Sequence, residues 1–249
     1  MSGAVRWGRL LAQNHRGVPV PRILGIALAV DAALWTVAYA IVAETGAAGW
    51  GSLGGLLLVF GAGLIDDLAP EGPRGIRNHL RSVAGGRVTT GLLKIVLIAA
   101  SAVLVVAILP RREGYAAVAG VVLLAGCANV WNGLDVAPGR CLKAFLVPAA
   151  AFAAWGSIAD APALVGLLIG AILVLPFDVR ESAMLGDSGA NTLGFAAGIG
   201  LFEVLPDPWV VVAACVAVLL NVAAETTSFS RVIERTPPLR WVDALGRRP

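Results

Sequence analysis

The sequence predicts an all-α polytopic membrane protein with about eight transmembrane helices and both termini in the cytoplasm. Of its 249 residues, 58% are hydrophobic and only 14% are charged, whereas a soluble domain usually carries about 25% charged residues. The mean hydropathy is +0.82. Apolar runs of nearly spanning length recur along the whole chain, and basic residues cluster between alternate pairs of them, which is typical of a polytopic protein.

Each predicted helix corresponds to one apolar run, although several runs are shorter than the about 20 residues that a crossing helix needs. Gly and Pro punctuate nearly every junction between the runs, as expected of turns. We therefore expect one integral membrane domain over 1–249, with a cytoplasmic arm at 1–22 and an amphipathic cytoplasmic tail at 228–249. The predicted spans are Ile23–Ala43, Trp50–Ile65, Leu92–Leu109, Tyr115–Trp131, Leu142–Ile158, Ala163–Phe177, Thr192–Leu205 and Trp209–Thr227.

The distribution of basic residues sets the predicted orientation. With eight spans, all of the 19 Lys and Arg residues except Arg111 and Arg112 fall on one side, which the positive-inside rule assigns to the cytoplasm of a plasma-membrane protein. The N-terminal arm lacks the compact apolar core and the cleavage site of a signal peptide. Because the basic residues are dispersed and no aromatic residues interleave with them, we expect no nucleic-acid partner.

Two adjacent carboxylates, Asp66 and Asp67, end the second predicted span. A carboxylate in the hydrocarbon costs roughly 2.5–3.5 kcal/mol, so this pair requires a counter-charge, and a divalent metal is the first candidate. Lys94 lies near the start of the next span, where it could reach the carboxylates or an anionic lipid head group. The basic residues of the loop between the two spans are explained equally well by the positive-inside rule, which gives an ordinary cytoplasmic loop the same composition.

The fourth predicted span ends in Asn129, Asn132 and Asp135. The two Asn residues are three positions apart, so we expect their amides to share a helix face just ahead of a carboxylate. Such a face suits uracil, sugar hydroxyls or metal-bound water. A helix C-cap rich in Asn and Gly is the alternative interpretation.

Gly186-Asp187-Ser188-Gly189 opens the seventh predicted span, and Asp178 follows the sixth. Backbone N–H groups and the helix dipole at such an N-terminus favour phosphate, although an Asp that caps its own helix has the same pattern. The predicted orientation puts these residues on the cytoplasmic face with Asp66, Asp67 and Asp135. We therefore predict one cytoplasmic site for a metal-bound diphosphate.

Gly63–Leu68, Asn129–Asp135 and Leu185–Gly194, in this order and on these helix ends, resemble the polyprenyl-phosphate N-acetylhexosamine-1-phosphate transferase superfamily. That superfamily includes the phospho-N-acetylmuramoyl-pentapeptide transferase of peptidoglycan synthesis and GlcNAc-1-phosphate transferases of other wall polymers. Its members transfer a sugar-1-phosphate from a UDP-sugar to undecaprenyl phosphate and release UMP. The resemblance, which extends from about His15 to Asn191, implies a transferase of cell wall biogenesis.

The resemblance also implies the cofactor, the partners and the roles of individual residues. The cofactor is Mg2+, with Mn2+ as a substitute, and the partners are a polyprenyl phosphate lipid and a UDP-sugar; a homodimer is left open. The implied catalytic residues are Asp66, Asp67 and Asp135, and the implied metal ligands are Asp187, Asp66 and Asp67. The implied substrate-binding residues are Asn129, Asn132, Lys94, Asn191, Asp178, His15 and Arg140.

The chain departs from the family pattern at several positions. Pro138 stands where a second carboxylate is usual, Asp178 stands where an Asn is common, and the region 228–248 carries arginines and Trp241 in place of a His-rich loop. A catalytically inactive relative that binds lipid phosphate or nucleotide sugar and regulates a partner is therefore an alternative. An ion-coupled transporter with Asp31 and Glu225 is a third, which the acidic residues at helix ends disfavour.

The tail has two interpretations of its own. From Pro237 to Arg247 it can form a short amphipathic helix with Trp241 and Leu245 toward the membrane, which favours a plain anchor on the inner leaflet. The alternative is a lid over the site.

Overall fold

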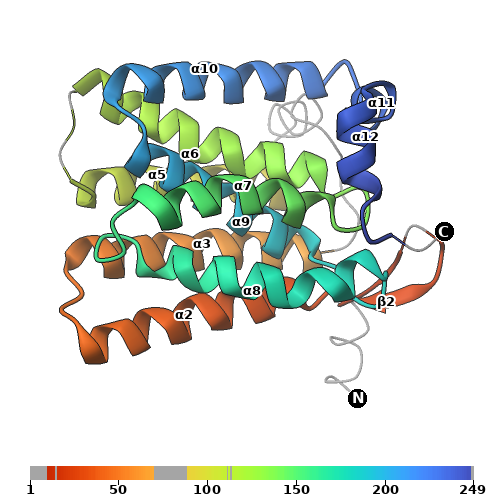
Figure 1. Cartoon of the computed structure of the whole chain (residues 1–249), viewed down its shortest axis with the longest axis horizontal. Helices are drawn as coiled ribbons and strands as arrows, with labels where there is room; N and C mark the ends of the chain where they lie inside the picture. Colours follow the sequence, from red (N-terminus) through yellow and green to blue (C-terminus); the bar gives the residue numbers. More distant parts are fainter. Residues whose placement is uncertain (1–9, 15, 70–88, 111, 113, 248–249) are drawn as a thin grey trace.

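The computed structural model describes residues 10–14, 16–69, 89–110, 112 and 114–247. His15 and most of the basic loop after Asp67 lie outside these residues. The described chain is a bundle of eight long helices with a hairpin and two short helices at one end, called here the hairpin end (Figure 1). The elements are β1 (Leu11–Gln13), β2 (Pro19–Pro21), α2 (Leu24–Val42), α3 (Ala47–Leu68), α5 (Thr90–Ile108), α6 (Gly114–Leu134), α7 (Arg140–Trp155), α8 (Pro162–Val179), α9 (Gly186–Val204), α10 (Asp207–Ala224), α11 (Phe229–Arg235) and α12 (Pro237–Ala244).

A long helix forms at each of the eight predicted apolar runs. Six of them, α2, α3, α5, α6, α8 and α10, are long and apolar enough to cross a membrane. On α10, for example, Val212, Val216 and Leu219 are exposed apolar residues, as expected on a lipid-facing helix. These findings confirm the helical, multi-pass membrane class.

The two remaining long helices differ from the six in length or in surroundings. The helix α7 has 16 residues and contains Pro148, so it is short for a spanning helix. The helix α9 is buried along almost its whole length and packs against α6, α3, α7 and α2. The bundle is therefore built around α9, and the acidic segment that opens this helix is held by its neighbours.

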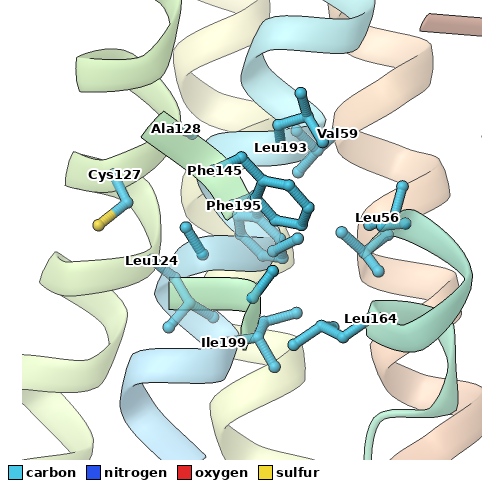
Figure 2. Packing of buried hydrophobic residues seen from close by; sticks show 14 of the residues in the cluster. Leu56, Val59, Leu124, Cys127, Ala128, Phe145, Leu164, Leu193, Phe195 and Ile199 are labelled. Carbon is cyan, nitrogen blue, oxygen red and sulfur yellow. The ribbon is translucent and has the colours of Figure 1, made fainter. Parts of the chain in front are cut away.

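Small residues allow the neighbours to approach α9 closely. A Cβ atom at Gly194 would lie 2.4 Å from the carbonyl oxygen of Cys127, and one at Gly198 would lie 2.7 Å from the Cα of Leu124. Close approach of this kind is how membrane helices pack without a hydrophobic driving force. Figure 2 shows the core that results, in which side chains of α9 meet those of α3, α6, α7 and α8; the labelled residues are Leu56, Val59, Leu124, Cys127, Ala128, Phe145, Leu164, Leu193, Phe195 and Ile199.

The prediction of an all-α chain misses a short antiparallel hairpin in the N-terminal arm, in which β1 pairs with β2. The Asn14 side chain accepts hydrogen bonds from the backbone N–H groups of Arg16 and Val18, at 3.0 and 2.8 Å, and Gly17 takes a φ of +74°. An Asx turn with a left-handed glycine reverses the chain. The prolines of β2 favour extended backbone, and this local chemistry explains the hairpin.

Candidate functional site

Asp67 caps the N-terminus of α9 from another helix. It lies at the end of α3 and is only 2% exposed. Its carboxylate accepts hydrogen bonds from the backbone N–H groups of Asp187, at 3.0 Å, and Ser188, at 2.9 Å. Arg22, just after β2, donates to the same carboxylate at 3.1 Å. The cap of α9 therefore comes from Asp67, and Asp187 does not cap its own helix.

Glycines bring the three segments around this cap into backbone contact. A Cβ atom at Gly63 would lie 2.6 Å from the Asp187 carbonyl oxygen, and one at Gly25 would lie 2.5 Å from the Gly189 nitrogen. Gly186 has a φ of +69°, and its Cβ atom would lie 2.7 Å from an oxygen of Asp67. A side chain at any of these positions would displace the start of α9.

Asp66, the neighbour of Asp67, faces a different partner. Its carboxylate accepts a hydrogen bond from the Lys94 ammonium at 2.7 Å and another from the Thr90 hydroxyl at 2.7 Å. The same Lys94 nitrogen lies 2.5 Å from a carboxylate oxygen of Asp187. Carboxylates from α3 and α9 thus converge on one cation supplied by α5.

The convergence of Asp66 and Asp187 fits the ligand set of a magnesium ion in part. Within the described residues, no group of three or more His, Cys, Asp or Glu side chains could hold a metal ion. Mg2+ usually takes only one or two carboxylates and completes its shell with water and substrate phosphates. Asp66 and Asp187 supply that number of carboxylates, and both already contact one positive charge, the Lys94 ammonium.

The two α6 amides that were predicted to bind substrate contact different helices in the structure. The Asn132 side-chain oxygen accepts a 3.3 Å hydrogen bond from Asn191 of α9, and the Asn191 amide also donates to the Asp187 carbonyl at 2.6 Å. The Asn129 amide instead donates to Asn221 of α10 at 2.5 Å. Asn132 and Asn191 therefore lie beside the cluster of Asp66, Asp187 and Lys94, called here the acidic group, whereas Asn129 connects α6 to α10.

Asp135 lies just beyond the end of α6 and is half-buried. Burial raises its pKa well above the ordinary value, and the negative charges of Asp178, Asp187 and Asp67 raise it further. No hydrogen bond or ion pair to its carboxylate is found in the part of the chain that the structure describes. Asp135 is therefore a carboxyl group at the hairpin end with an unengaged side chain.

Asp178 holds the connection between α6 and α7. This residue is 6% exposed, and its carboxylate accepts a 2.8 Å hydrogen bond from the backbone N–H of Gly139. Gly139 has a φ of +70°, and a Cβ atom there would lie 2.4 Å from Val179. The segment 135–139, which carries Asp135 and Pro138, is thus fixed from the α8 side.

Arg140 contacts the C-terminal tail. Its guanidinium donates to both carboxylate oxygens of Asp243 on α12, at 2.9 and 3.0 Å, and to the Ser230 hydroxyl at 2.8 Å. Lys143 donates to the carbonyl oxygens of Val242, Asp243 and Leu245, which neutralises the C-terminus of α12. The predicted substrate-binding arginine is therefore engaged in docking the tail.

The tail also reaches the segment 135–139. The Arg247 guanidinium donates to the Pro138 carbonyl at 2.9 Å and to Asp243 at 2.6 Å. Burial alone would raise the pKa of Asp243, but its hydrogen bonds with Arg140 and the charges of Arg140, Arg247 and Lys143 hold that pKa below the ordinary value. The docked tail and Asp178 thus hold this segment from two sides.

Sequence reasoning did not identify three partners that the structure shows: Arg22 for Asp67, Thr90 for Asp66 and Asp243 for Arg140. One geometric signal was available for the first two: adjacent helix residues point about 100° apart, so Asp66 and Asp67 are directed toward different neighbours. The hairpin adds a contact on the α8–α9 connection, where Arg16 pairs with Glu181 at 3.0 Å. His15 was predicted to bind substrate and lies outside the described residues.

Comparison of the chain with protein-family models, with curated proteins and with solved structures finds no match.

Proposed function

We propose that this chain is a polyprenyl-phosphate sugar-1-phosphate transferase that takes its sugar-1-phosphate, of the N-acetylhexosamine type, from a UDP-sugar. The observation that carries the proposal is the meeting of Asp66 and Asp187 at the Lys94 ammonium. In the reaction, an oxygen of the lipid phosphate forms a bond to the β-phosphorus of the UDP-sugar, and the bond from that phosphorus to the bridging oxygen breaks. UMP leaves with the bridging oxygen.

Asp66 and Asp187 would hold a Mg2+ ion together with the diphosphate. When bound, that ion would neutralise negative charge on the phosphoryl group. Lys94 lies between the two carboxylates and would turn its ammonium toward a phosphate oxygen. Asp67 supports this arrangement indirectly, because it fixes the turn of α9 from which Asp187 projects.

Asp135, Asn132 and Asn191 would serve the substrates. A carboxylate with a raised pKa is a better proton acceptor when it is ionised, so Asp135 suits the removal of a proton from a singly protonated lipid phosphate. The Asn132 and Asn191 amides lie against the first turn of α9, where they would orient uridine or sugar hydroxyls.

The proposal includes eight spans, in which α9 crosses inside the protein and α7 crosses as a short helix at its surface, and a plasma-membrane location. The acidic group, the hairpin and the tail share one end of the bundle (Figure 1). The basic residues that follow Asp67 and those of the tail would place this end in the cytoplasm. That location supplies the UDP-sugar from water and the lipid phosphate from the inner leaflet.

The direct test is UMP release by the purified chain in the presence of undecaprenyl phosphate, Mg2+ and a panel of UDP-sugars. We expect activity with at least one N-acetylhexosamine donor, and we expect Asp66→Asn and Asp187→Asn to lower kcat by at least about 100-fold. Asp160→Asn is the matched control, because Asp160 lies in the α7–α8 connection, away from this group. Thermal unfolding of each variant separates lost chemistry from lost folding.

A catalytically inactive relative is the second candidate. It is favoured by Pro138, which replaces a carboxylate, and by the engagement of Asp67 and Arg140 in contacts within the protein. Such a protein would bind UDP-sugar or lipid phosphate and release no UMP with any donor. Saturable binding in the same samples, without turnover, would therefore replace the first proposal by this one.

A further inference from the structure

The helix α12 is attached to the bundle by its polar edge, and its apolar residues are exposed. Asp243 and the carbonyl groups at the end of the helix make the contacts with Arg140 and Lys143. Trp241 is 67% exposed and Leu245 is 44% exposed. A surface helix of a soluble protein does the reverse and buries its apolar stripe against the core.

The exposed apolar residues Trp241 and Leu245 are called here the apolar stripe of the tail. The placement of the tail points to a membrane surface as the partner of this stripe. The candidate span α10 ends at Ala224 and α11 begins at Phe229, so the tail starts where a spanning helix ends. Figure 1 shows α12 lying across the end of the bundle, at a steep angle to the long helices. A helix in this position runs along the plane of the membrane.

The charges of the tail select the kind of membrane surface. Arg231 and Arg235 on α11 and Arg240 on α12 are exposed, and they form no ion pair with another described residue. One acidic residue, Glu234 on α11, is exposed between Arg231 and Arg235. An apolar stripe bordered by arginines matches an interfacial helix on anionic lipid head groups.

We propose that α11 and α12 form an interfacial element that binds anionic lipids, with Trp241, Val242 and Leu245 in the acyl boundary and the arginines at the head groups. The polar docking through Arg140 and Lys143 fixes the depth of the element relative to the bundle. This inference concerns the lipid partner of the tail and does not depend on the transferase proposal.

The test uses spin labels on the full chain in nanodiscs, with Cys215→Ser as background because Cys127 and Cys141 are buried. One label is placed at Leu245→Cys and its matched control at Arg240→Cys on the opposite side of the helix. Val212→Cys, exposed on α10, is the lipid reference, and Glu44→Cys, exposed between α2 and α3, is the aqueous reference. Collision rates with oxygen and with a water-soluble nickel chelate are measured for each.

In nanodiscs of phosphatidylglycerol and phosphatidylethanolamine, we expect the label at 245 to behave as at 212 and the label at 240 to behave as at 44. Both labels behaving as at 44 would overturn the proposal. A label at 245 that is shielded from both reagents would assign the stripe to a protein partner or a second copy, which also overturns it.

A second set of measurements tests whether the tail prefers anionic lipids. In nanodiscs of phosphatidylcholine alone, and in the triple variant Arg231→Gln, Arg235→Gln and Arg240→Gln, we expect the label at 245 to become several-fold more accessible to the nickel chelate. Equal accessibility in anionic and zwitterionic lipid would overturn the assignment to anionic head groups. Unchanged thermal unfolding of the labelled variants ensures that the bundle is intact.

Discussion

Asp67 and Ser188 lie 121 positions apart, and the carboxylate of the first accepts a 2.9 Å hydrogen bond from the backbone N–H of the second. This bond joins α3 to the first turn of α9 and, with the bond to the Asp187 N–H, caps that helix. Asp66, one position earlier, faces Lys94 instead. The two aspartates therefore have different roles. Asp67 holds the backbone of Asp187, and Asp66 contacts the same Lys94 ammonium as the Asp187 side chain.

Asp67→Asn is expected to destabilise the protein by about 2–4 kcal/mol, because the amide cannot pair with Arg22 as a charge and presents a donor toward other donors. Asp66→Asn should cost less, because the Asp66 side chain is more exposed than that of Asp67. Thermal or denaturant unfolding in one detergent measures both. An Asp67→Asn protein as stable as wild type but devoid of activity would instead make Asp67 a reacting group.

Gly63→Ala is expected to lower the free energy of unfolding by up to about 3 kcal/mol. The new methyl group would meet backbone atoms of Asp187 and Ser188, which cannot rotate away as a side chain could. Gly61→Ala on the same helix is the matched control, since a Cβ atom there has nothing within 4 Å and Ala favours helix. Unfolding of the two variants should therefore differ clearly. Equal stabilities would show that α3 and α9 do not touch at this point.

Docking of the tail is expected to weaken in acid. The folded pKa of Asp243 lies below its ordinary value, so its ion pairs stabilise the docked state above the unfolded pKa and are lost as pH falls through the folded pKa, that is, below about pH 4. A spin label at Arg240→Cys should become mobile in that range. A label at Val212→Cys reports whether the bundle itself survives.

Asp243→Asn should make the label at position 240 mobile at every pH, since the neutral amide no longer pairs with Arg140 and Arg247. An immobile label in this variant, or a label whose mobility ignores acid while the bundle stays folded, would rule out docking through Asp243.

Asp135→Asn is expected to stabilise the protein at pH 7. The folded pKa of Asp135 is raised by burial and by three neighbouring carboxylates, so wild type loses stability as pH rises from the unfolded pKa toward the folded one. The Asn variant lacks this loss, so the free energies of unfolding of the two proteins should become equal below about pH 4. Unfolding between pH 4 and pH 8 tests this, with Glu44→Gln at an exposed position as control; a destabilised Asp135→Asn protein at pH 7 would contradict it.

The long helices could be predicted from the sequence because apolar runs of spanning length have few alternatives in a membrane. The meeting of Asp66, Asp187 and Lys94 follows from their places at helix ends, which the alternation of spans brings together. The hairpin could not be found by hydropathy, since it depends on a local turn at Asn14 and Gly17 that buries little apolar surface.

The specific partners at the site depend on helix rotation, which the sequence pattern does not determine in a chain apolar on nearly all sides. Asn129 and Asn132 were predicted to share a face, yet they bond to different helices. Arg140, which was predicted to bind substrate, pairs with Asp243, a residue 103 positions later. Contacts between such distant segments require the packed structure.

Binding of Mn2+ as a stand-in for Mg2+, measured by the loss of the free-ion paramagnetic resonance signal in the presence of a UDP-sugar, tests most directly whether Asp66 and Asp187 form one cation site. We predict binding that Mg2+ displaces, that weakens at least about 10-fold in Asp66→Asn and in Asp187→Asn, and that persists or tightens in Lys94→Gln, where the resident cation is removed. Binding that is unchanged in Asp187→Asn, or lost equally in Asp160→Asn, would contradict the account.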